Sequence, residues 1–275
     1  MNITYWGSGS YEAIPAPFCG CPVCENAREK KGKEIRTRHS ANIDGTIQLD
    51  YSPDIFLQTL NGLNLRNVRY LLITHGHNDH FDVEEMALGR HSCSLTGLPR
   101  LTVIGNAYVT QRIRDIETLY GHKIDMIEKI METAYYQPIE IDESTVVTPL
   151  SGNHAQEIGG CNLYHISRKG KQLLYAHDSG PFGGKVFEWL SGRQMDAVSL
   201  DCTGALLGTG VTHMDIASCD KTVHQLRDDG SLKRSGIVIY SHFSHAGGAT
   251  HEQLETESKL RGWIPAFDGM SVKTE

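Results

Sequence analysis

The sequence has no hydrophobic run long enough to cross a bilayer, and its first residues lack the basic lead of a secretory signal. Its seven cysteines are an odd number, which does not suit a framework of disulfide bonds. We therefore expect a cytoplasmic protein with reduced thiols and no membrane association.

Positive charge is also scarce, since 33 acidic residues outnumber 26 basic residues and give a formal net charge of −7. This balance argues against non-specific binding to nucleic acid or to anionic membranes. It leaves an anionic substrate open, because bound cations can invert the field inside a site.

No internal repeat, low-complexity tract or Pro/Ser-rich linker interrupts the 275 residues, of which 39% are hydrophobic. A chain of this length and composition predicts a single domain over residues 1–275 with one large core. Strands and helices are expected in two runs, which predicts an α/β fold of two packed sheets with helices outside.

One stretch organises the rest of the chain: the apolar run 68–73 is followed closely by three histidines and an aspartate. If the run is a buried strand, His75, His77, Asp79 and His80 lie at its carboxyl end, where α/β sheets commonly place their sites. Imidazoles and carboxylates suit Zn²⁺, Mn²⁺ or Fe²⁺, and four ligands at this spacing suggest two cations. The alternative is a histidine-rich surface loop.

A second cluster lies near the N-terminus, where Cys19, Cys21 and Cys24 are separated by glycine and proline. Thiolates at this spacing can converge on one Zn²⁺ when the chain turns tightly between them. We expect a structural zinc site that pins a loop near residues 10–25, with His245 as the fourth ligand. The alternative is three unpaired loop cysteines. The other cysteines, Cys93, Cys161, Cys202 and Cys219, are expected to be small buried residues.

Further candidate ligands each follow a predicted strand: His154 after residues 145–150, Asp178 after 172–176 and His242 after 236–240. Asp44-Gly45 predicts a hairpin whose second strand ends at Asp50. Asp50 either supports the metal-binding loop or caps a following helix. His213 precedes a helix expected over residues 216–227, with Thr212 as its cap, so His213 would stand at a helix end that favours phosphate.

Three other stretches carry weaker predictions. Residues 124–131 indicate a helix and residues 135–141 a strand. The basic patch 36–40 either contacts an anionic substrate or forms a solvated turn. The glycine-rich residues 7–10 lack a following Gly-Lys-Ser/Thr, so a tight turn is favoured over a phosphate cradle.

Taken in order, these motifs resemble those of the metallo-β-lactamase superfamily and, more narrowly, its PhnP-type phosphodiesterases. The resemblance is carried by Cys19-Gly20-Cys21-x-x-Cys24, His75-Gly76-His77-Asn78-Asp79-His80, Asn153-His154, Asp178-Ser179-Gly180, Asp201-Cys202, His213-Met214-Asp215, His242-Phe243-Ser244-His245 and Phe267-Asp268-Gly269-Met270. It covers essentially the whole chain and implies the four-layer αββα sandwich of that superfamily. The cysteine cluster also occurs in the PqqB-like branch.

The resemblance implies two active-site Mn²⁺ ions, with Zn²⁺ or Fe²⁺ as alternatives, and one structural Zn²⁺. His75, His77 and His154 would hold one active-site cation, Asp79, His80 and His242 the other, and Asp178 would bridge them. Asp79 and His213 are the catalytic candidates. His213 would contact the phosphate or protonate the leaving oxygen, although a helix N-terminus beside it favours the neutral imidazole.

PhnP-type enzymes act in phosphonate breakdown, where they open 5-phosphoribosyl 1,2-cyclic phosphate to ribose 1,5-bisphosphate. The resemblance implies the same reaction here, by attack of a hydroxide that bridges the two cations. We expect a small phosphorylated sugar or nucleotide as substrate, and a homodimer is one compatible assembly. The alternatives are a cyclic-nucleotide or other phosphodiesterase, a β-lactam or thioester hydrolase, and a PqqB-like metal-binding accessory protein.

Overall fold

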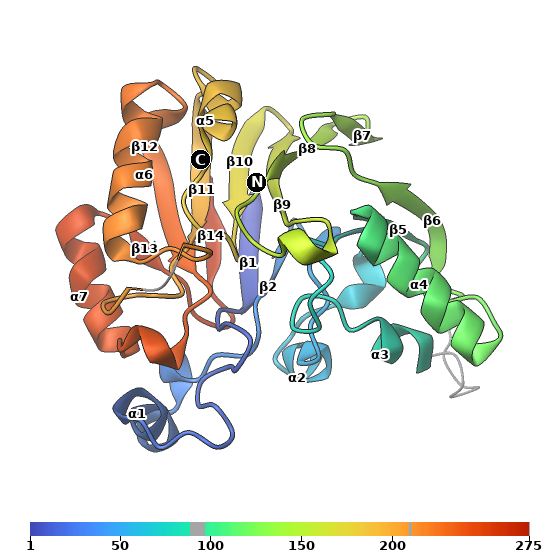
Figure 1. The fold of residues 1–275 in the computed structure, drawn as a ribbon, viewed down its shortest axis with the longest axis horizontal. Helices are drawn as coiled ribbons and strands as arrows, with labels where there is room; N and C mark the ends of the chain where they lie inside the picture. The colour runs from blue at the N-terminus through green and yellow to red at the C-terminus, as the bar shows by residue number, and fades with distance from the viewer. Residues whose placement is uncertain (89–96, 209–210, 275) are drawn as a thin grey trace.

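The computed structural model describes residues 1–88, 97–208 and 211–274, which form two mixed sheets packed face to face (Figure 1). The first sheet consists, in spatial order, of β14 (Ser271–Lys273), β1 (Asn2–Gly7), β2 (Ser40–Ile43), β3 (Ile47–Leu49), β4 (Tyr70–Leu72), β5 (Leu101–Gly105) and β6 (Ile127–Glu132). The second consists of β13 (Ile264–Pro265), β12 (Leu232–Ser241), β11 (Met195–Asp201), β10 (Lys171–Ala176), β9 (Asn162–Arg168), β8 (Thr145–Ser151) and β7 (Ile139–Asp142).

The helices are α1 (Pro22–Lys30), α2 (Ile55–Leu60), α3 (Val83–Leu88), α4 (Ala107–Tyr120), α5 (Gly184–Leu190), α6 (Ile216–Asp228) and α7 (His251–Arg261), with short 3₁₀ turns η1 (Gly32–Glu34), η2 (Leu65–Asn67), η3 (Gln156–Ile158) and η4 (His245–Gly247). Helices α3 to α7 lie against the outer faces of the sheets, whereas α1 and α2 lie below the sheets in Figure 1. Figure 1 shows α6 and α7 outside the second sheet and α3 and α4 outside the first. No helix in the described ranges is both long enough and apolar enough to cross a membrane.

Three buried hydrophobic clusters account for this layering. One lies between the sheets and joins residues such as Ile43 and Leu72 of the first sheet to Ile166 and Leu173 of the second. Another joins the second sheet to α5, α6 and α7, and the third joins the first sheet to α3 and α4. Each sheet is therefore buried on both faces. The predicted αββα sandwich is confirmed.

Strand direction explains why the polar motifs meet. Strands β3, β4 and β5 are parallel to one another, and so are β10, β11 and β12. β8 and β10 both pair antiparallel with β9, so they share one direction. The residues that follow these strands therefore gather at one edge of each sheet.

The hairpin predicted at Asp44-Gly45 is present, with both residues in the left-handed region at φ of 50° and 72°. The helix predicted over 124–131 is wrong, because most of that segment forms β6 and pairs in parallel with β5. Its apolar residues recur at helix-like spacing, but pairing at a sheet edge outweighs this local preference. The strand predicted over 135–141 is reduced to β7, which begins at Ile139.

Candidate metal centre

Three polar residues leave their strands through an unusual backbone conformation. Asp50 after β3, Asp178 after β10 and His242 after β12 have φ values of 62°, 51° and 66°. Non-glycine residues in this region carry a strain of about 1–3 kcal/mol each, and such strain is concentrated at functional sites. In this protein, the positive φ of each residue turns a buried side chain out of its sheet and towards the candidate ligands that follow β4.

The first group of candidate ligands consists of His75, His77, His154 and Asp178, whose ligand atoms all lie within 4.8 Å of one another. His77 Nδ1 lies 2.8 Å from His75 Nε2 and 3.3 Å from His154 Nε2. Ligand atoms on one tetrahedral cation with bonds of about 2.1 Å lie about 3.4 Å apart. Three imidazoles and one carboxylate therefore have the chemistry and spacing of a cation site.

The second group consists of Asp79, His80, His242 and the same Asp178. Asp178 Oδ2 lies 3.2 Å from His75 Nε2 in the first group and 3.1 Å from His80 Nε2 in the second. His80 Nε2 also lies 3.1 Å from Asp79 Oδ2. One carboxylate therefore stands between two groups of ligand atoms, which is the arrangement needed for a bridging ligand.

Buried partners orient the imidazoles of these groups. Thr74 Oγ1 lies 3.1 Å from His75 Nδ1, Asp50 Oδ2 lies 2.7 Å from His80 Nδ1, and Thr203 Oγ1 lies 2.8 Å from His242 Nδ1. Each contact leaves Nε2 of the histidine directed into the site. Such partners determine the tautomer and the ring orientation of metal-binding histidines.

Asp50 has the supporting position, rather than the capping position, of its two predicted alternatives. Its Oδ1 accepts hydrogen bonds from the Thr74 amide and hydroxyl at 2.8 and 3.0 Å, and the residue before α2 is Asp54. His75 and His80 are fully buried, which excludes the alternative of a histidine-rich surface loop.

Asp79 and His154 have the charge states that bind a cation. Burial opposes protonation of His80, but Asp79 and Asp50 raise the pKa of its imidazole, so a cation bound there would take the place of a proton. Although burial opposes ionisation of Asp79, the neighbouring His80 lowers the pKa of this carboxyl to about 2. Burial lowers the pKa of His154 to about 4, which keeps its imidazole neutral near pH 7. Ionised carboxylates and neutral imidazoles are the forms that bind metals.

His213 lies beside these groups in the same cavity. Its Nδ1 is 3.1 Å from Asp178 Oδ1 and 3.6 Å from Asp201 Oδ2. Burial opposes protonation, but the two carboxylates raise the pKa of His213 to about 10, and cations bound to Asp178 would oppose that rise. The sequence suggested that a helix N-terminus would keep the His213 imidazole neutral. In the structure, two carboxylates instead favour its protonated form.

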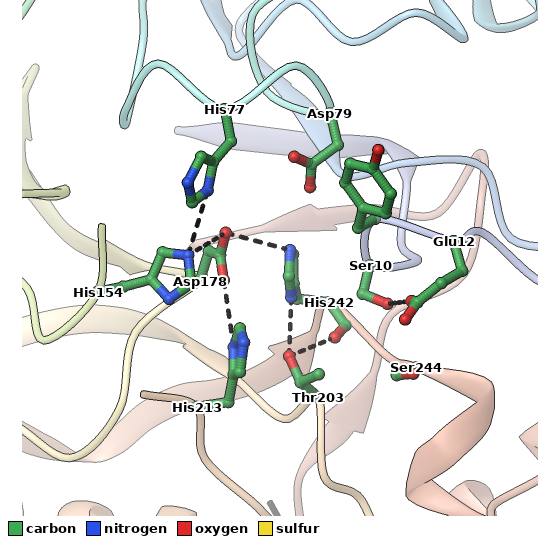
Figure 2. A pocket seen from close by; sticks show the side chains of 11 residues that line it. Ser10, Glu12, His77, Asp79, His154, Asp178, Thr203, His213, His242 and Ser244 are labelled. Carbon is green, nitrogen blue, oxygen red and sulfur yellow. Dashed lines mark hydrogen bonds and ion pairs between the residues drawn. The ribbon is translucent and has the colours of Figure 1, made fainter. Parts of the chain in front are cut away.

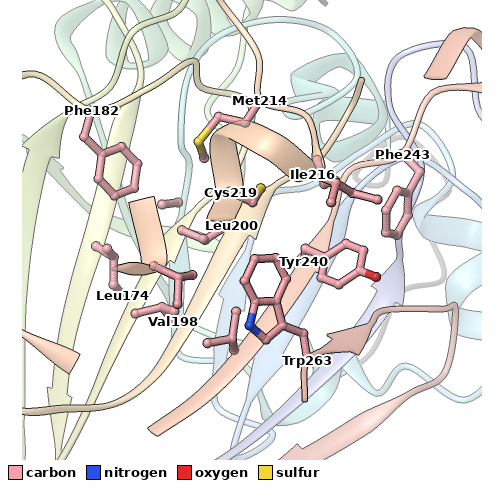
Figure 3. Packing of buried hydrophobic residues seen from close by; sticks show 14 of the residues in the cluster. Leu174, Phe182, Val198, Leu200, Met214, Ile216, Cys219, Tyr240, Phe243 and Trp263 are labelled. Atoms are coloured by element: carbon pink, nitrogen blue, oxygen red, sulfur yellow. The ribbon is translucent and has the colours of Figure 1, made fainter. Parts of the chain in front are cut away.

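The predicted cap Thr212 is wrong. The N-cap of α6 is Asp215, whose side chain accepts a hydrogen bond from the Ser218 amide. Met214, between the cap and His213, is fully buried in the cluster between α6 and the second sheet (Figure 3). This anchor holds His213 at the edge of the cavity.

An open cavity of about 250 Å³ lies over the candidate ligands. It is lined by Ser10, Tyr11, Glu12, His77, Asp79, His154, Asp178, Thr203, His213, His242 and Ser244 (Figure 2). Sequence reasoning did not identify the side chains of Ser10, Tyr11, Glu12 and Ser244 as part of the site. In the sequence, Ser10 ends the glycine-rich turn and Ser244 lies in the motif His242-Phe243-Ser244-His245, but neither pattern indicated that these side chains line a cavity.

Glu157 is another residue that sequence reasoning missed. Its Oε1 lies 3.2 Å from His77 Nε2, on the side of the ring opposite the other candidate ligands. Neither alternative for the basic patch holds for Arg36, which is buried and donates hydrogen bonds to Ser8 Oγ and to the Ala266 carbonyl. Arg38 pairs with Asp54.

The cysteine cluster lies apart from these groups. Ligand atoms of Cys19, Cys21, Cys24 and His245 all lie within 4.8 Å of one another, and His245 Nδ1 is 3.4 Å from Cys19 Sγ. Burial raises the pKa of Cys24 to about 12, whereas hydrogen bonds outweigh burial and lower that of Cys21 to about 6. A cation would be needed to hold three thiolates together here.

Among the other cysteines, Cys161, Cys202 and Cys219 are buried as expected, and Cys93 lies outside the described residues. His177, next to Asp178, belongs to neither group of candidate ligands and contacts Ser199 Oγ at 2.6 Å.

The fold is that of one known family. A beta-lactamase superfamily domain matches residues 46–243 of this chain. The chain therefore belongs to the metallo-β-lactamase superfamily, a family whose fold implies divalent cations, and the donor sets described above fit them. No curated protein sequence matches the chain significantly.

Solved structures of low sequence identity share the fold across the chain. Zn²⁺-bound PqqB from Methylobacterium extorquens has a TM-score of 0.73 and 20% identity, covering 99% of this chain and 100% of its own. A diphosphatase of the PhnP family has a TM-score of 0.72 and 22% identity, with 99% and 97% covered. The short form of human tRNase Z has a TM-score of 0.65 and 15% identity, with 100% of both chains covered.

Proposed function

We propose that the protein is a metal-dependent hydrolase that uses two divalent cations to hydrolyse a small cyclic phosphodiester. The observation that carries this proposal is the position of Asp178 between two groups of ligand atoms, beneath an open cavity that also contains His213. The fold shared with a diphosphatase of the PhnP family supports hydrolysis at a phosphate group.

His75, His77 and His154 would hold the first cation, Asp79, His80 and His242 would hold the second, and Asp178 would contribute to both sites. When bound, the cations would supply Lewis acidity, which lowers the pKa of water and neutralises charge on phosphoryl oxygens. We propose Mn²⁺, with Zn²⁺ and Fe²⁺ as alternatives, because imidazoles and carboxylates accept all three. A structural Zn²⁺ on the three clustered cysteines and His245 completes the proposed metal content.

His213 and Asp79 are the side chains proposed to handle protons. The carboxylates of Asp178 and Asp201 favour a proton on Nδ1 of His213, which leaves Nε2 for the phosphate or for the leaving oxygen. The ionised Asp79 carboxylate lines the cavity and can accept a hydrogen bond from water there. The oxygen of water adds to phosphorus as Asp79 accepts its proton, the ester P–O bond breaks, and the leaving oxygen takes a proton from His213.

The size of the cavity limits the substrate. A volume of about 250 Å³ is just below the usual range for ligand pockets, so it suits a sugar phosphate better than a polynucleotide. The reaction that the sequence resemblance implies is the opening of 5-phosphoribosyl 1,2-cyclic phosphate to ribose 1,5-bisphosphate. A cyclic nucleotide is the alternative substrate.

Phosphorus NMR of the Mn²⁺-loaded protein tests this proposal. The substrates are ribosyl 1,2-cyclic phosphates, 2′,3′-cyclic nucleotides and bis(4-nitrophenyl) phosphate. We expect a ribosyl cyclic phosphate to open faster than the nucleotides. Hydrolysis of the nucleotides alone would support phosphodiester hydrolysis but would identify a cyclic nucleotide as the substrate. A metal-loaded protein that hydrolyses none of these esters would contradict the proposal and favour a carbonyl substrate or a PqqB-like accessory role.

A further inference from the structure

One wall of the cavity contributes no candidate ligand. Ser10 and Glu12 line this wall, and Figure 2 shows them beyond His242 on the side away from His154. Ser10 Oγ donates a 2.7 Å hydrogen bond to Glu12 Oε2, while Oε1 accepts none from any described residue. Glu12 therefore offers a carboxylate oxygen with free lone pairs to whatever enters the cavity.

The turn that carries Glu12 is held by several backbone contacts. The Ser10 amide donates to the Phe243 carbonyl at 2.9 Å, and the Ala13 amide donates to the Ser10 carbonyl at 3.0 Å. Arg38 Nε donates to the Tyr11 carbonyl at 2.8 Å. Ala13 has a φ of 59°, a conformation that a non-glycine residue keeps only where the surroundings impose it. The backbone of the turn is thus held in place, and the Ser10 hydroxyl orients the Glu12 carboxylate on it.

Arg38 contacts this wall through the Tyr11 carbonyl but does not line the cavity. No Lys or Arg is found among the described residues that line the cavity. The nearby Arg36 is buried against Ser8 and Ala266, and Arg38 is paired with Asp54. A phosphate placed against Glu12 would therefore meet a like charge with no guanidinium or ammonium to offset it, which is an effective means of rejecting a ligand.

We infer that Glu12 is a specificity-determining residue for the part of the substrate remote from the reacting phosphate. It accepts a hydrogen bond from an uncharged hydroxyl group there and disfavours a second phosphate. This inference rests on the proposed phosphodiester hydrolysis and narrows its substrate class. For a ribosyl 1,2-cyclic phosphate, the ester with a free 5-hydroxyl is preferred to the ester with a 5-phosphate, so this chain departs from the substrate that the sequence resemblance implies.

The test compares kcat/KM for these two esters in the Mn²⁺-loaded protein, with Glu12→Gln and Glu12→Lys as the test variants. We expect wild-type protein to favour the 5-hydroxyl ester by about tenfold or more, a difference of about 1.4 kcal/mol. Glu12→Gln should reduce that ratio several-fold, and Glu12→Lys should reverse it. Glu188→Gln removes the same charge from an exposed position on α5 and should leave the ratio unchanged.

The outcomes separate the inference from the proposed function. A wild-type preference for the 5-phosphate ester, or an unchanged ratio in a folded, metal-loaded Glu12→Gln variant, would overturn the inference. Hydrolysis of bis(4-nitrophenyl) phosphate without hydrolysis of either ribosyl ester would also overturn it and leave the proposed function intact. If the metal-loaded protein hydrolyses neither ribosyl ester, nor bis(4-nitrophenyl) phosphate, nor the 2′,3′-cyclic nucleotides, the proposed function itself is overturned.

Discussion

Asp50 Oδ2 lies 2.7 Å from His80 Nδ1, so the residue that follows β3 orients the ring of a candidate ligand that follows β4. Both side chains are fully buried. The contact directs His80 Nε2 towards Asp79 and Asp178, each at 3.1 Å. Support of the site therefore depends on the parallel pairing of two neighbouring strands.

Asp50→Asn tests this support. The amide keeps the shape of the side chain but loses its charge, so we expect divalent-cation affinity to fall about 10–100-fold while the protein stays folded. Competition with a fluorescent chelator measures the affinity, and circular dichroism checks the fold. Asp115→Asn, at an exposed position on α4, is the matched control. Equal affinities for Asp50→Asn and wild type would contradict the supporting role.

His77→Ala should abolish phosphodiesterase activity without unfolding the protein. His77 is partly exposed, so its loss should change stability little, whereas a lost ligand should lower kcat/KM at least about a hundredfold. His224→Ala, on the exposed face of α6, is the control and should keep wild-type activity. If His77→Ala unfolds the chain, the cluster has a structural role instead.

Cys21→Ser should act mainly on stability. Replacing one of three clustered thiols should lower zinc content and lower Tm by about 4 °C or more, which corresponds to about 1–2 kcal/mol for a chain of this size. Elemental analysis and calorimetry measure these quantities. Cys161→Ala changes a buried cysteine outside the cluster and should leave zinc content unaltered. Unchanged zinc and Tm in Cys21→Ser would argue against the structural site.

His213→Gln should lower kcat about 10²–10⁴-fold, the usual range for loss of a positioned proton donor or acceptor. Because His213 is proposed to act on the substrate rather than on a cation, active-site metal content should stay at the wild-type level. Kinetics and elemental analysis on the same sample make the distinction. Metal loss in parallel with activity would show that His213 is a ligand, since it also lies within a compact group with Asp178, Asp201 and His242.

The ion pairs of Arg168 with Asp44 and Asp142 predict a pH dependence of stability away from the site. Burial opposes ionisation of Asp44, but hydrogen bonds from the Asn2 amide and Arg168 lower its pKa below the usual range. A folded-state pKa below the unfolded value stabilises the fold above about pH 4, and this contribution is lost as pH falls through the folded-state pKa.

The Tm difference between wild type and Asp44→Asn should therefore be largest near neutral pH and should shrink below about pH 4. Thermal melts from pH 3 to pH 7 measure it, with Asp115→Asn as the control for a general charge effect. A difference that is constant over this range would show that Asp44 contributes no ionisation-linked stability.

The sequence was most informative where chemistry is local. Histidines and an aspartate directly after an apolar run predicted a ligand cluster at a strand end, and the structure places His75 and His80 there in buried positions. Three cysteines separated by glycine and proline similarly predicted a compact thiol cluster. In both cases the spacing along the chain nearly determines the spacing in space.

The tertiary structure decided what depends on distant pairing. The helix expected over 124–131 became β6 because β5 offers a strand to pair with, and Arg36 became buried because Ala266 and Ser8 surround it. Glu12 reaches the cavity only because its turn is hydrogen-bonded to Phe243, more than two hundred residues away. The sequence by itself determined which ligand chemistry the chain carries. Only the packing of two sheets decided which atoms share a site and which side chains face the substrate, because those contacts join segments that have no fixed relation until both sheets form.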